Sequence, residues 1–240
     1  MIIVVTCQLT IIQVNGNLIR ENRPLSSSSF DEIVIDGVFD VFLTSSSKTN
    51  PTSKVEIETT VDLQKHVIVE ILDNHILSIR LVDVSRVEKH INVYITFPSS
   101  SLRRYTFQGT GNSVTDDNGI SNEDNQVFAI DHRGVGDLTF RLNVYKLEFD
   151  LAGTGNSVFS GQVRQQARFN AQGTGDINAL DLSTRTADVL VEGVSTVRVM
   201  ATEDLQIEVT GISTVHYRLP KGKTPSKAVS TGLGKIVRLS

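Results

Sequence analysis

The sequence predicts an all-β fold, built as a β-solenoid or β-helix-like stack of roughly 20-residue repeats with an N-terminal β layer. Composition is the first indication, because valine, isoleucine and threonine are abundant while the chain has only 5 prolines. A recurring glycine motif and a strict alternation of apolar and polar residues are the second and third. No segment has the three-to-four-residue period of a longer helix, so at most one helical turn is expected, near Thr60–Lys65.

The glycine motif recurs through the second half of the chain and first occurs as QGTGNSV at residues 108–114. Successive leading glycines are spaced by 25, 19, 20, 20, 18 and 21 residues; they are Gly109, Gly134, Gly153, Gly173, Gly193, Gly211 and Gly232. Such self-similarity is typical of stacked repeats, in which each unit buries its face only against its neighbours. Because serine replaces the second glycine in two units, we expect a limit on side-chain size there more than a need for positive φ.

The alternation within the units predicts strands with one buried face. Residues 205–219 carry apolar or small side chains at odd positions and polar ones at nearly all even positions. Residues 167–179 and 188–199 follow the same rule. A period of two places successive side chains on opposite faces of a strand, so the apolar set is expected to form the core.

The first hundred residues differ from the repeats but are also predicted to be strands. Residues 30–43 resemble one repeat unit, and strand-like runs follow at 54–61, 66–72, 75–81 and 90–98, with a hairpin turn predicted at Asp73-Asn74. We divide the chain into an apolar N-terminal strand or remnant export signal (1–16), an N-terminal β region (17–98) and a Gly-x-Gly repeat region (99–240) continuous with it. The boundary between the N-terminal β region and the repeat region is not sharp and is placed near Pro98.

Charge and composition argue against several classes of partner and site. The net charge of −4 and the pI of about 5.7 give no electrostatic reason to expect nucleic acid or an anionic membrane. A single cysteine, Cys7, excludes an internal disulfide framework and a cysteine-based zinc site. The N-terminal apolar stretch lacks a basic region before it and is too short and polar to span a bilayer, so no transmembrane segment is expected.

Candidate catalytic and cofactor sites are weak in this sequence. The string Gly153-Thr154-Gly155 lacks the third glycine and the following helix of a phosphate-binding loop. In the one local cluster, Asp131-His132-Arg133, His132 is predicted to face inward and its neighbours outward, so the three do not converge. The five histidines have no metal-ligand spacing. We therefore expect no catalytic residue, no cofactor and no metal.

One polar position recurs directly after the second glycine of each unit and forms a candidate contact ladder. Its members are Asn112, Asp137, Asn156, Asp176, Thr196 and Thr214. Small polar side chains stacked on one face are able to touch sugar hydroxyls or a weakly bound cation. The alternative, which we favour, is that they tolerate the tight backbone and hydrogen-bond along the stack.

The order of several strings resembles a known family. ENRPLSSSSFDEIVIDGVFDVFL is followed by KVEIETT, HILSIRL and INVYITFP, and then by repeated GTGNS and GTGDI units. This series resembles the bacterial "putative auto-transporter adhesin" family with a GIN head domain, from about Asn17 to the C-terminus. The resemblance implies an all-β, solenoid-like fold and a secreted or surface-attached protein, and it supplies no catalytic residues.

These observations together predict a non-catalytic surface or secreted module that serves as an adhesin, a structural domain or an interaction domain. The expected partner is an unidentified surface ligand, a glycan or a protein, and not nucleic acid. The alternative hypothesis is a carbohydrate-active enzyme or carbohydrate-binding protein on a β-helix scaffold. The last unit, AVSTGLGKIVRL, is apolar on both faces, so it is expected to pack within the chain or against a second subunit in a homo-oligomer.

Overall fold

The computed structural model describes residues 10–11, 17–27, 29–73, 75–87 and 91–240, and these are nearly all strand or turn. Their one helix is α1 (Val61–Gln64), a single turn where the sequence predicted one. The all-β prediction is therefore confirmed. Most of the predicted segment 1–16, including Cys7, lies outside the described residues; β1 (Thr10–Ile11) pairs in parallel with β8 (Val84–Arg86).

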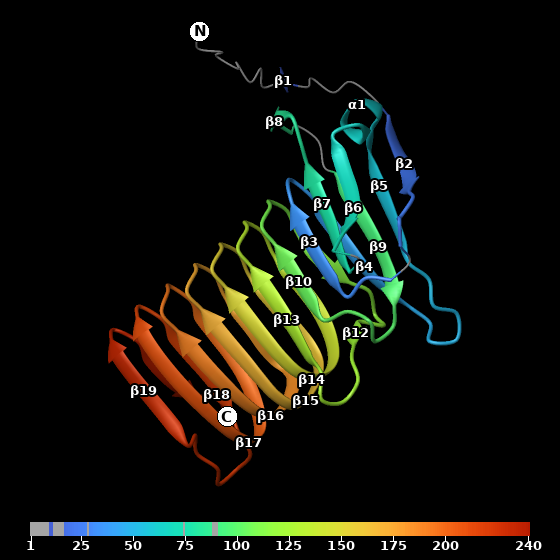
Figure 1. The fold of residues 1–240 in the computed structure, drawn as a ribbon. Helices are drawn as coiled ribbons and strands as arrows, with labels where there is room; N and C mark the ends of the chain where they lie inside the picture. Colours follow the sequence, from blue (N-terminus) through green and yellow to red (C-terminus); the bar gives the residue numbers. More distant parts are fainter. Residues whose placement is uncertain (1–9, 12–16, 28, 74, 88–90) are drawn as a thin grey trace.

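The main sheet folds back on itself into two facing layers (Figure 1). Layer A is in front in Figure 1 and contains β6 (Val67–Leu72), β7 (Ile76–Leu81), β3 (Glu32–Asp36), β10 (Arg104–Phe107), β13 (Val127–His132) and β19 (Lys227–Gly232). Layer B lies behind and contains β2 (Leu18–Arg23), β5 (Lys54–Thr60), β9 (Asn92–Pro98), β4 (Asp40–Ser46), β11 (Ser113–Thr115), β18 (Thr214–Arg218) and β20 (Lys235–Arg238).

Four long strands bend from layer B into layer A and connect the two. They are β14 (Leu138–Leu151), β15 (Ser157–Ala171), β16 (Ile177–Val191) and β17 (Thr196–Gly211). The short β12 (Ile120–Ser121) pairs with β14. Each long strand pairs in parallel with the next, so that Phe149 lies opposite Phe169 and both face the core. Because partners lie about one repeat apart in sequence, every coil places its apolar side chains on those of its neighbour.

The coils turn from layer A to layer B at the Gly-x-Gly motifs. Gly136 and Gly155 both have φ of +142°, and a Cβ on Gly155 would lie 1.9 Å from the carbonyl oxygen of Gly136. These corners therefore need glycine for its φ as well as for its size, which corrects the sequence-based expectation that size dominates. At the two serine positions φ is negative, and the Ser213 hydroxyl donates to the carbonyl of Gly193 over 2.7 Å.

Chain order and spatial order differ in the N-terminal part. The coil formed by β3 and β4 lies between β7 and β9 on one side and β10 and β11 on the other. Beyond it the strands reverse: β2 pairs antiparallel with β5, β5 with β9, and β6 with β7. The β6–β7 hairpin was predicted at Asp73-Asn74; Asp73 has φ of +50°, and Asn74 lies outside the described residues. The division of the chain near Pro98 stays a prediction.

The C-terminal end of the stack is a single parallel coil. β19 pairs with β17 and β20 with β18, and no further described strand covers their outer edges. Ile236 packs partly against the core, whereas Val229, Leu233 and Val237 are exposed. Within the described chain, the last unit therefore packs on one face only, and a second subunit on the other face stays a prediction.

Candidate functional site

The residues of the candidate polar ladder lie on successive coils, and their Asp and Asn side chains accept hydrogen bonds from the backbone of neighbouring coils. Their role as a contact surface stays a prediction. The N–H of Asn112 donates to Asp40 Oδ1 (2.9 Å), and that of Asp137 donates to Asn112 Oδ1 (3.0 Å). The series continues from Asn156 to Asp137 (2.7 Å), from Asp176 to Asn156 (3.1 Å) and from Thr196 to Asp176 (3.1 Å). At Thr214 the N–H donates instead to the carbonyl of Ser195 (3.0 Å). One oxygen of each Asp and Asn in this ladder therefore links two coils.

Aspartate and asparagine alternate along this ladder. The order is Asp40, Asn112, Asp137, Asn156, Asp176. Neighbouring coils lie about 4.8 Å apart, so the alternation keeps carboxylates about two coils from one another and reduces their repulsion. Asp40 was missed by the sequence analysis, although its unit was recognised: Phe39 stands where the second glycine of the other units stands.

A hollow lies on the outward face of layer A, across β14, β15, β16, β17 and β19, and we call it the layer A groove. It has a volume of about 440 Å³. Its polar lining residues are Glu148, Asp150, Arg168, Asn170, Asp188, Gln206, Glu208 and Lys227. The parallel register aligns Glu148, Arg168, Asp188, Gln206 and Lys227 in one row across the strands. Opposite charges therefore alternate along much of the groove.

Some of the groove side chains pair with one another, and others remain open to solvent. Asn170 donates to Asp150 (2.8 Å), and Lys227 lies 2.5 Å from the Glu208 carboxylate. Arg168 is exposed and has no carboxylate within 4.0 Å among the described residues. A second hollow of about 250 Å³ shares Asp150 and Asn170 with the groove and extends it. Donors and acceptors in such rows suit a polar, hydrogen-bonding ligand.

The three side chains of Asp131-His132-Arg133 do not converge, as the sequence predicted, although Arg133 lies 3.7 Å from Asp131. His132 is wholly buried, and neither ring nitrogen has a hydrogen-bond partner among the described residues. Burial lowers the pKa of His132, so its neutral form is favoured. Asp131 points outward and accepts from Arg104 over 2.6 Å. An acid and a base held on opposite sides of a strand do not act on one substrate atom.

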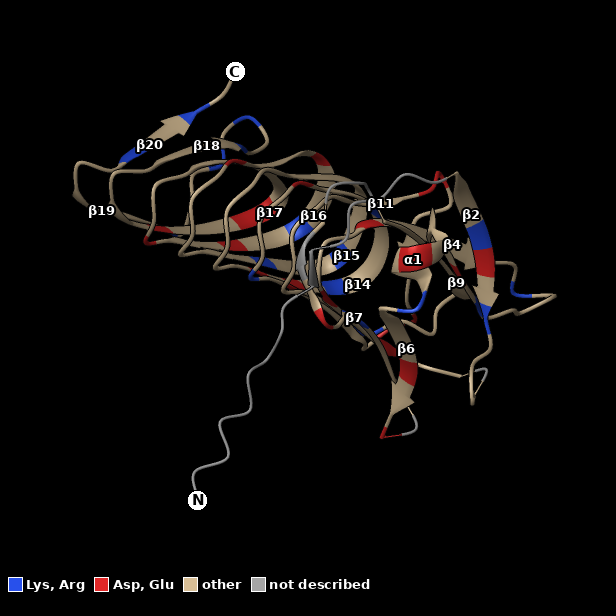
Figure 2. Cartoon of the chain, turned by 90° about the horizontal axis from the view of Figure 1, so that it is seen from above, with Lys and Arg blue, Asp and Glu red and all other residues tan. Residues whose placement is uncertain are grey.

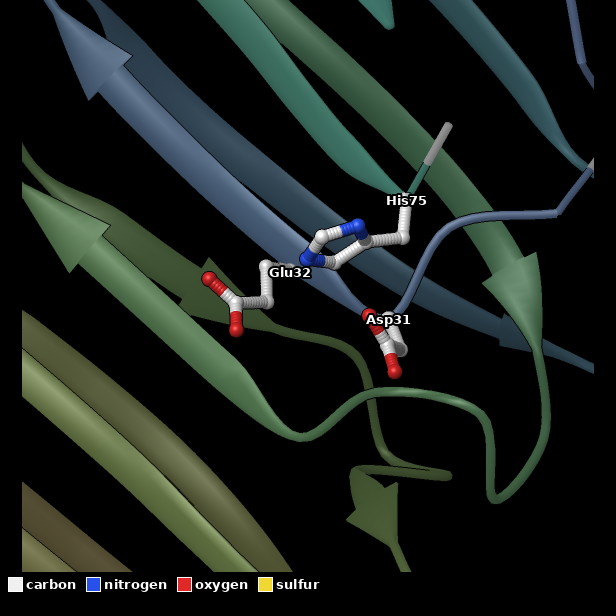
Figure 3. A group of neighbouring side chains, drawn as sticks. All are labelled: Asp31, Glu32 and His75. Atoms are coloured by element: carbon white, nitrogen blue, oxygen red, sulfur yellow. The ribbon is translucent and has the colours of Figure 1, made fainter. Parts of the chain in front are cut away.

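A second charged cluster joins β3 to β7 and was not found from the sequence. Figure 3 shows Asp31, Glu32 and His75, whose potential ligand atoms lie within 4.8 Å of one another. His75 Nδ1 is 2.8 Å from the Asp73 carbonyl oxygen, and this hydrogen bond, with the nearby carboxylates, raises the pKa of His75. Arg103 Nε lies 3.4 Å from Asp31. Arg103 therefore already pairs with one of the two carboxylates, and the cluster links neighbouring strands.

The family model described as "Putative auto-transporter adhesin, head GIN domain" matches residues 29–218. The chain belongs to this family. The match runs from just before β3 to the end of β18, so it includes the N-terminal β region and the stacked coils. The resemblance indicated by the sequence motifs is confirmed. A comparison with curated proteins gives no match.

Solved structures share the fold of this GIN head domain. A "putative adhesin" from Bacteroides fragilis has a TM-score of 0.82 at 23% identity, with 94% of this chain and 98% of that chain covered. A "Putative lipid binding protein" from Parabacteroides distasonis has a TM-score of 0.67 at 18% identity, with the same coverage of 94% and 98%. A "putative adhesin" from Parabacteroides merdae, also covered to 94% and 98%, has a TM-score of 0.56 at 16% identity. At these identities the likeness is one of fold.

Within the described residues, no helix has the length and apolar character that crossing a membrane requires.

Proposed function

We propose that this GIN head domain is a non-catalytic β-solenoid module of the cell surface or the extracellular space, which acts by binding as an adhesin or an interaction domain. Family membership supports the adhesin class and the location. The observation that carries the proposal is the layer A groove, where parallel register holds charged and amide side chains in rows on a rigid sheet. Weak contacts repeated along such rows add up when the ligand is itself repetitive.

The groove suits this role better than the polar ladder does. Each Asp and Asn of the ladder gives one oxygen to a neighbouring coil, and the second oxygen of Asp176 accepts from Arg198 over 3.3 Å. Arg168 of the groove is open to solvent. We therefore propose a glycan or protein ligand that contacts the groove, with the ladder as a secondary contact surface.

A binding array with a matched pair of variants tests this proposal. Beads coated with the full chain are exposed to arrays of surface glycans and of extracellular matrix proteins. Arg168→Gln with Asp188→Asn removes one cation and one anion from the groove and leaves the net charge unchanged. We expect it to lower binding to the recognised ligand by about tenfold, because two charge-assisted hydrogen bonds are lost.

The control variant changes the opposite layer. Arg141→Gln with Asp181→Asn also removes one exposed cation and one exposed anion, and binding should stay within about twofold of wild type, since ΔΔG well below 1.4 kcal/mol is expected for remote surface changes. Equal loss in both variants, or no ligand on either array, contradicts the groove as the binding site.

The alternative of a carbohydrate-active enzyme gains no support from the family or from the solved structures. A reducing-end assay on every glycan that binds separates it from an adhesin. Turnover that a single substitution such as Asp150→Asn abolishes would overturn the non-catalytic proposal. Sedimentation at several protein concentrations tests the predicted homo-oligomer, and a strictly monomeric protein would remove it.

A further inference from the structure

Charge is distributed very unevenly along the chain. Residues 218–240 contain 6 of the 23 lysines and arginines and none of the 27 aspartates and glutamates. The rest of the chain therefore carries 17 basic and 27 acidic side chains. The overall net charge of −4 conceals a basic terminal coil on an acidic body.

The structure gathers most of these cations at the open end of the stack. We call Arg218, Lys221, Lys223, Lys235 and Arg238 the basic cap. Figure 2 shows Lys and Arg at both ends of β20 and on the loop that follows β18. Arg238 pairs in register with Tyr217, so Arg218 lies one position further along the neighbouring strand. In Figure 1 this end is the one remote from the N-terminal β region.

The cations of the basic cap have few acidic partners. Arg238 donates to the carbonyl oxygens of Lys223 (2.8 Å), Pro220 (3.0 Å) and Leu219 (3.2 Å), which are uncharged. Lys223 Nζ donates to the carbonyls of Thr202 and Glu203. No described carboxylate lies within 4.0 Å of Arg218, Lys221 or Lys235. Their charge therefore faces solvent.

The acidic groups nearest the cap are already engaged. The Glu203 carboxylate pairs with Arg185 over 2.6 Å. Asp204 accepts from the Ser226 hydroxyl over 2.7 Å, and this bond, with the field of Lys223, lowers its pKa. Asp204 therefore offsets part of the charge of Lys223, and it does not offset the charge of the other cations of the cap.

Protection of free sheet edges explains only part of this charge. Lysine on an edge strand discourages edge-to-edge pairing, and Lys235 on β20 fits that role. Lys221 and Lys223 lie in the loop between strands, and Arg218 is on β18, which β20 already covers. These three are not needed to protect an edge.

We propose that the basic cap binds an anionic surface polymer, a polysaccharide that carries carboxylate or sulfate groups. This inference rests on the proposed binding function and adds a second contact surface at the end of the stack. Lysine and arginine are the side chains that recognise such anions, arginine in a bidentate manner. Repeated charges along a flexible polymer match several solvent-facing cations on one end of the protein.

The surroundings of the cap favour a polysaccharide over a lipid or nucleic acid surface. The most exposed apolar side chains at this end, Leu233 (73%) and Ile212 (64%), lie at the glycine corner beside Lys235. The other four cations of the cap lie at the opposite end of β20, around Arg238. A membrane-binding face would place cations and apolar groups together. The one aromatic side chain of the terminal coils, Tyr217, is half-buried, so no exposed ring is available for base stacking.

Binding to a pair of polymers that differ only in charge tests the proposal. Dextran sulfate, polygalacturonate and uncharged dextran of similar length are titrated against the full chain at several salt concentrations. We expect the two anionic polymers to bind with affinity that falls as salt rises, and dextran not to bind. The triple variant Arg218→Gln, Lys221→Gln, Lys235→Gln should lose about tenfold or more in affinity and show a shallower salt dependence.

A control triple variant removes the same number of charges elsewhere. Lys48→Gln, Lys65→Gln and Arg141→Gln are exposed and remote from the cap in sequence and strand order, and their binding should match wild type. Equal loss in both triples, or no binding of either anionic polymer, would overturn the inference. So would a cap-dependent preference for anionic lipid vesicles, for duplex DNA or for a second copy of the chain. The cap variant is also tested on the arrays used for the groove. If it loses polymer binding but keeps array binding, the groove proposal is unaffected. Failure of the cap proposal is therefore distinguishable from failure of the groove proposal.

Discussion

The two ends of the coil stack are terminated in different ways. At the N-terminal end, strand direction reverses, and β2, β5, β6 and α1 close over a core that includes Leu63. At the C-terminal end, one more parallel coil is added, and every residue of β19 is exposed. The first end is sealed by packing, whereas the second stays open and carries charge. The two ends of the sheet are therefore closed in different ways.

The buried amide of Gln64 is central to the N-terminal closure. Its Nε2 donates to the carbonyls of Ile57 (2.9 Å) and Ile19 (3.0 Å), and its side-chain oxygen accepts from Arg23 (2.5 Å). One side chain therefore joins α1, β5 and β2. At the C-terminal end Arg238 similarly bonds three carbonyls, but it does so in solvent, where each bond contributes less.

The largest loss of stability is expected from a substitution at a glycine corner in the interior of the stack. Gly155→Ala places a Cβ 1.9 Å from a backbone oxygen at φ of +142°, so unfolding free energy should fall by about 3 kcal/mol or more. Gly232→Ala in the terminal coil is also strained, at φ of +78°, but its Cβ would meet its nearest atom only at 3.3 Å, so it should cost clearly less. Urea denaturation of both variants measures the difference, and equal losses would show that the terminal coil packs as tightly as the interior.

The next largest loss of stability is expected at the N-terminal end, and a matched substitution at the C-terminal end allows the two ends to be compared. Gln64→Leu removes the amide hydrogen bonds to the carbonyls of Ile57 and Ile19 and the side-chain acceptor of Arg23, so it should lower the unfolding free energy by about 2 kcal/mol. Arg238→Gln should cost about 1 kcal/mol or less, because water replaces its bonds. Thermal and urea unfolding provide the test, with the exposed Lys65→Gln as a neutral control. A larger loss for Arg238→Gln would contradict a sealed N-terminal and an open C-terminal end.

A pH-dependent effect is expected from His132 in the interior. Burial lowers its folded-state pKa below the unfolded value of about 6.5. The unfolded chain thus binds the proton more readily, so stability is full above that pH and falls as pH drops towards 5. His132→Leu matches Leu151, its partner on the next coil, and should remove this loss and add about 1 kcal/mol at pH 7.

The control for that prediction is His75, whose pKa is shifted in the opposite direction. Its raised pKa favours the folded state at low pH, and this contribution is lost as pH rises. His75→Gln should therefore leave the acid-side loss of stability in place. If the His132→Leu variant still loses stability at low pH, that loss comes from titratable groups other than His132.

The smallest effect is expected in the polar ladder. Asn156→Ala removes the acceptor of the Asp176 N–H and should cost about 1 kcal/mol. Asn156→Asp keeps the acceptor but places three carboxylates on successive coils, so its cost should shrink as salt is raised. Denaturation at two salt concentrations separates the variants, and a salt-independent cost for Asn156→Asp would contradict repulsion along the ladder.

Local pattern allowed much of the fold to be predicted. The alternation in residues 205–219 placed Leu205, Ile207 and Val209 in the core, where they are fully buried. The glycine spacing located the corners, and the residue after the second glycine located the ladder. These features were predictable because each depends on the chain's own geometry, a period of two for a strand and the absence of a Cβ at a corner.

The sequence by itself thus determined the strands, their buried faces and the corners, whereas the tertiary structure alone decided which strand lies beside which. The coil of β3 and β4 is inserted between later segments, and Asp31 meets His75 only for that reason. The rows of the layer A groove likewise depend on register between strands. Backbone hydrogen bonds between strands are the same for any sequence, so periodicity fixes a strand's faces but leaves its neighbours to packing.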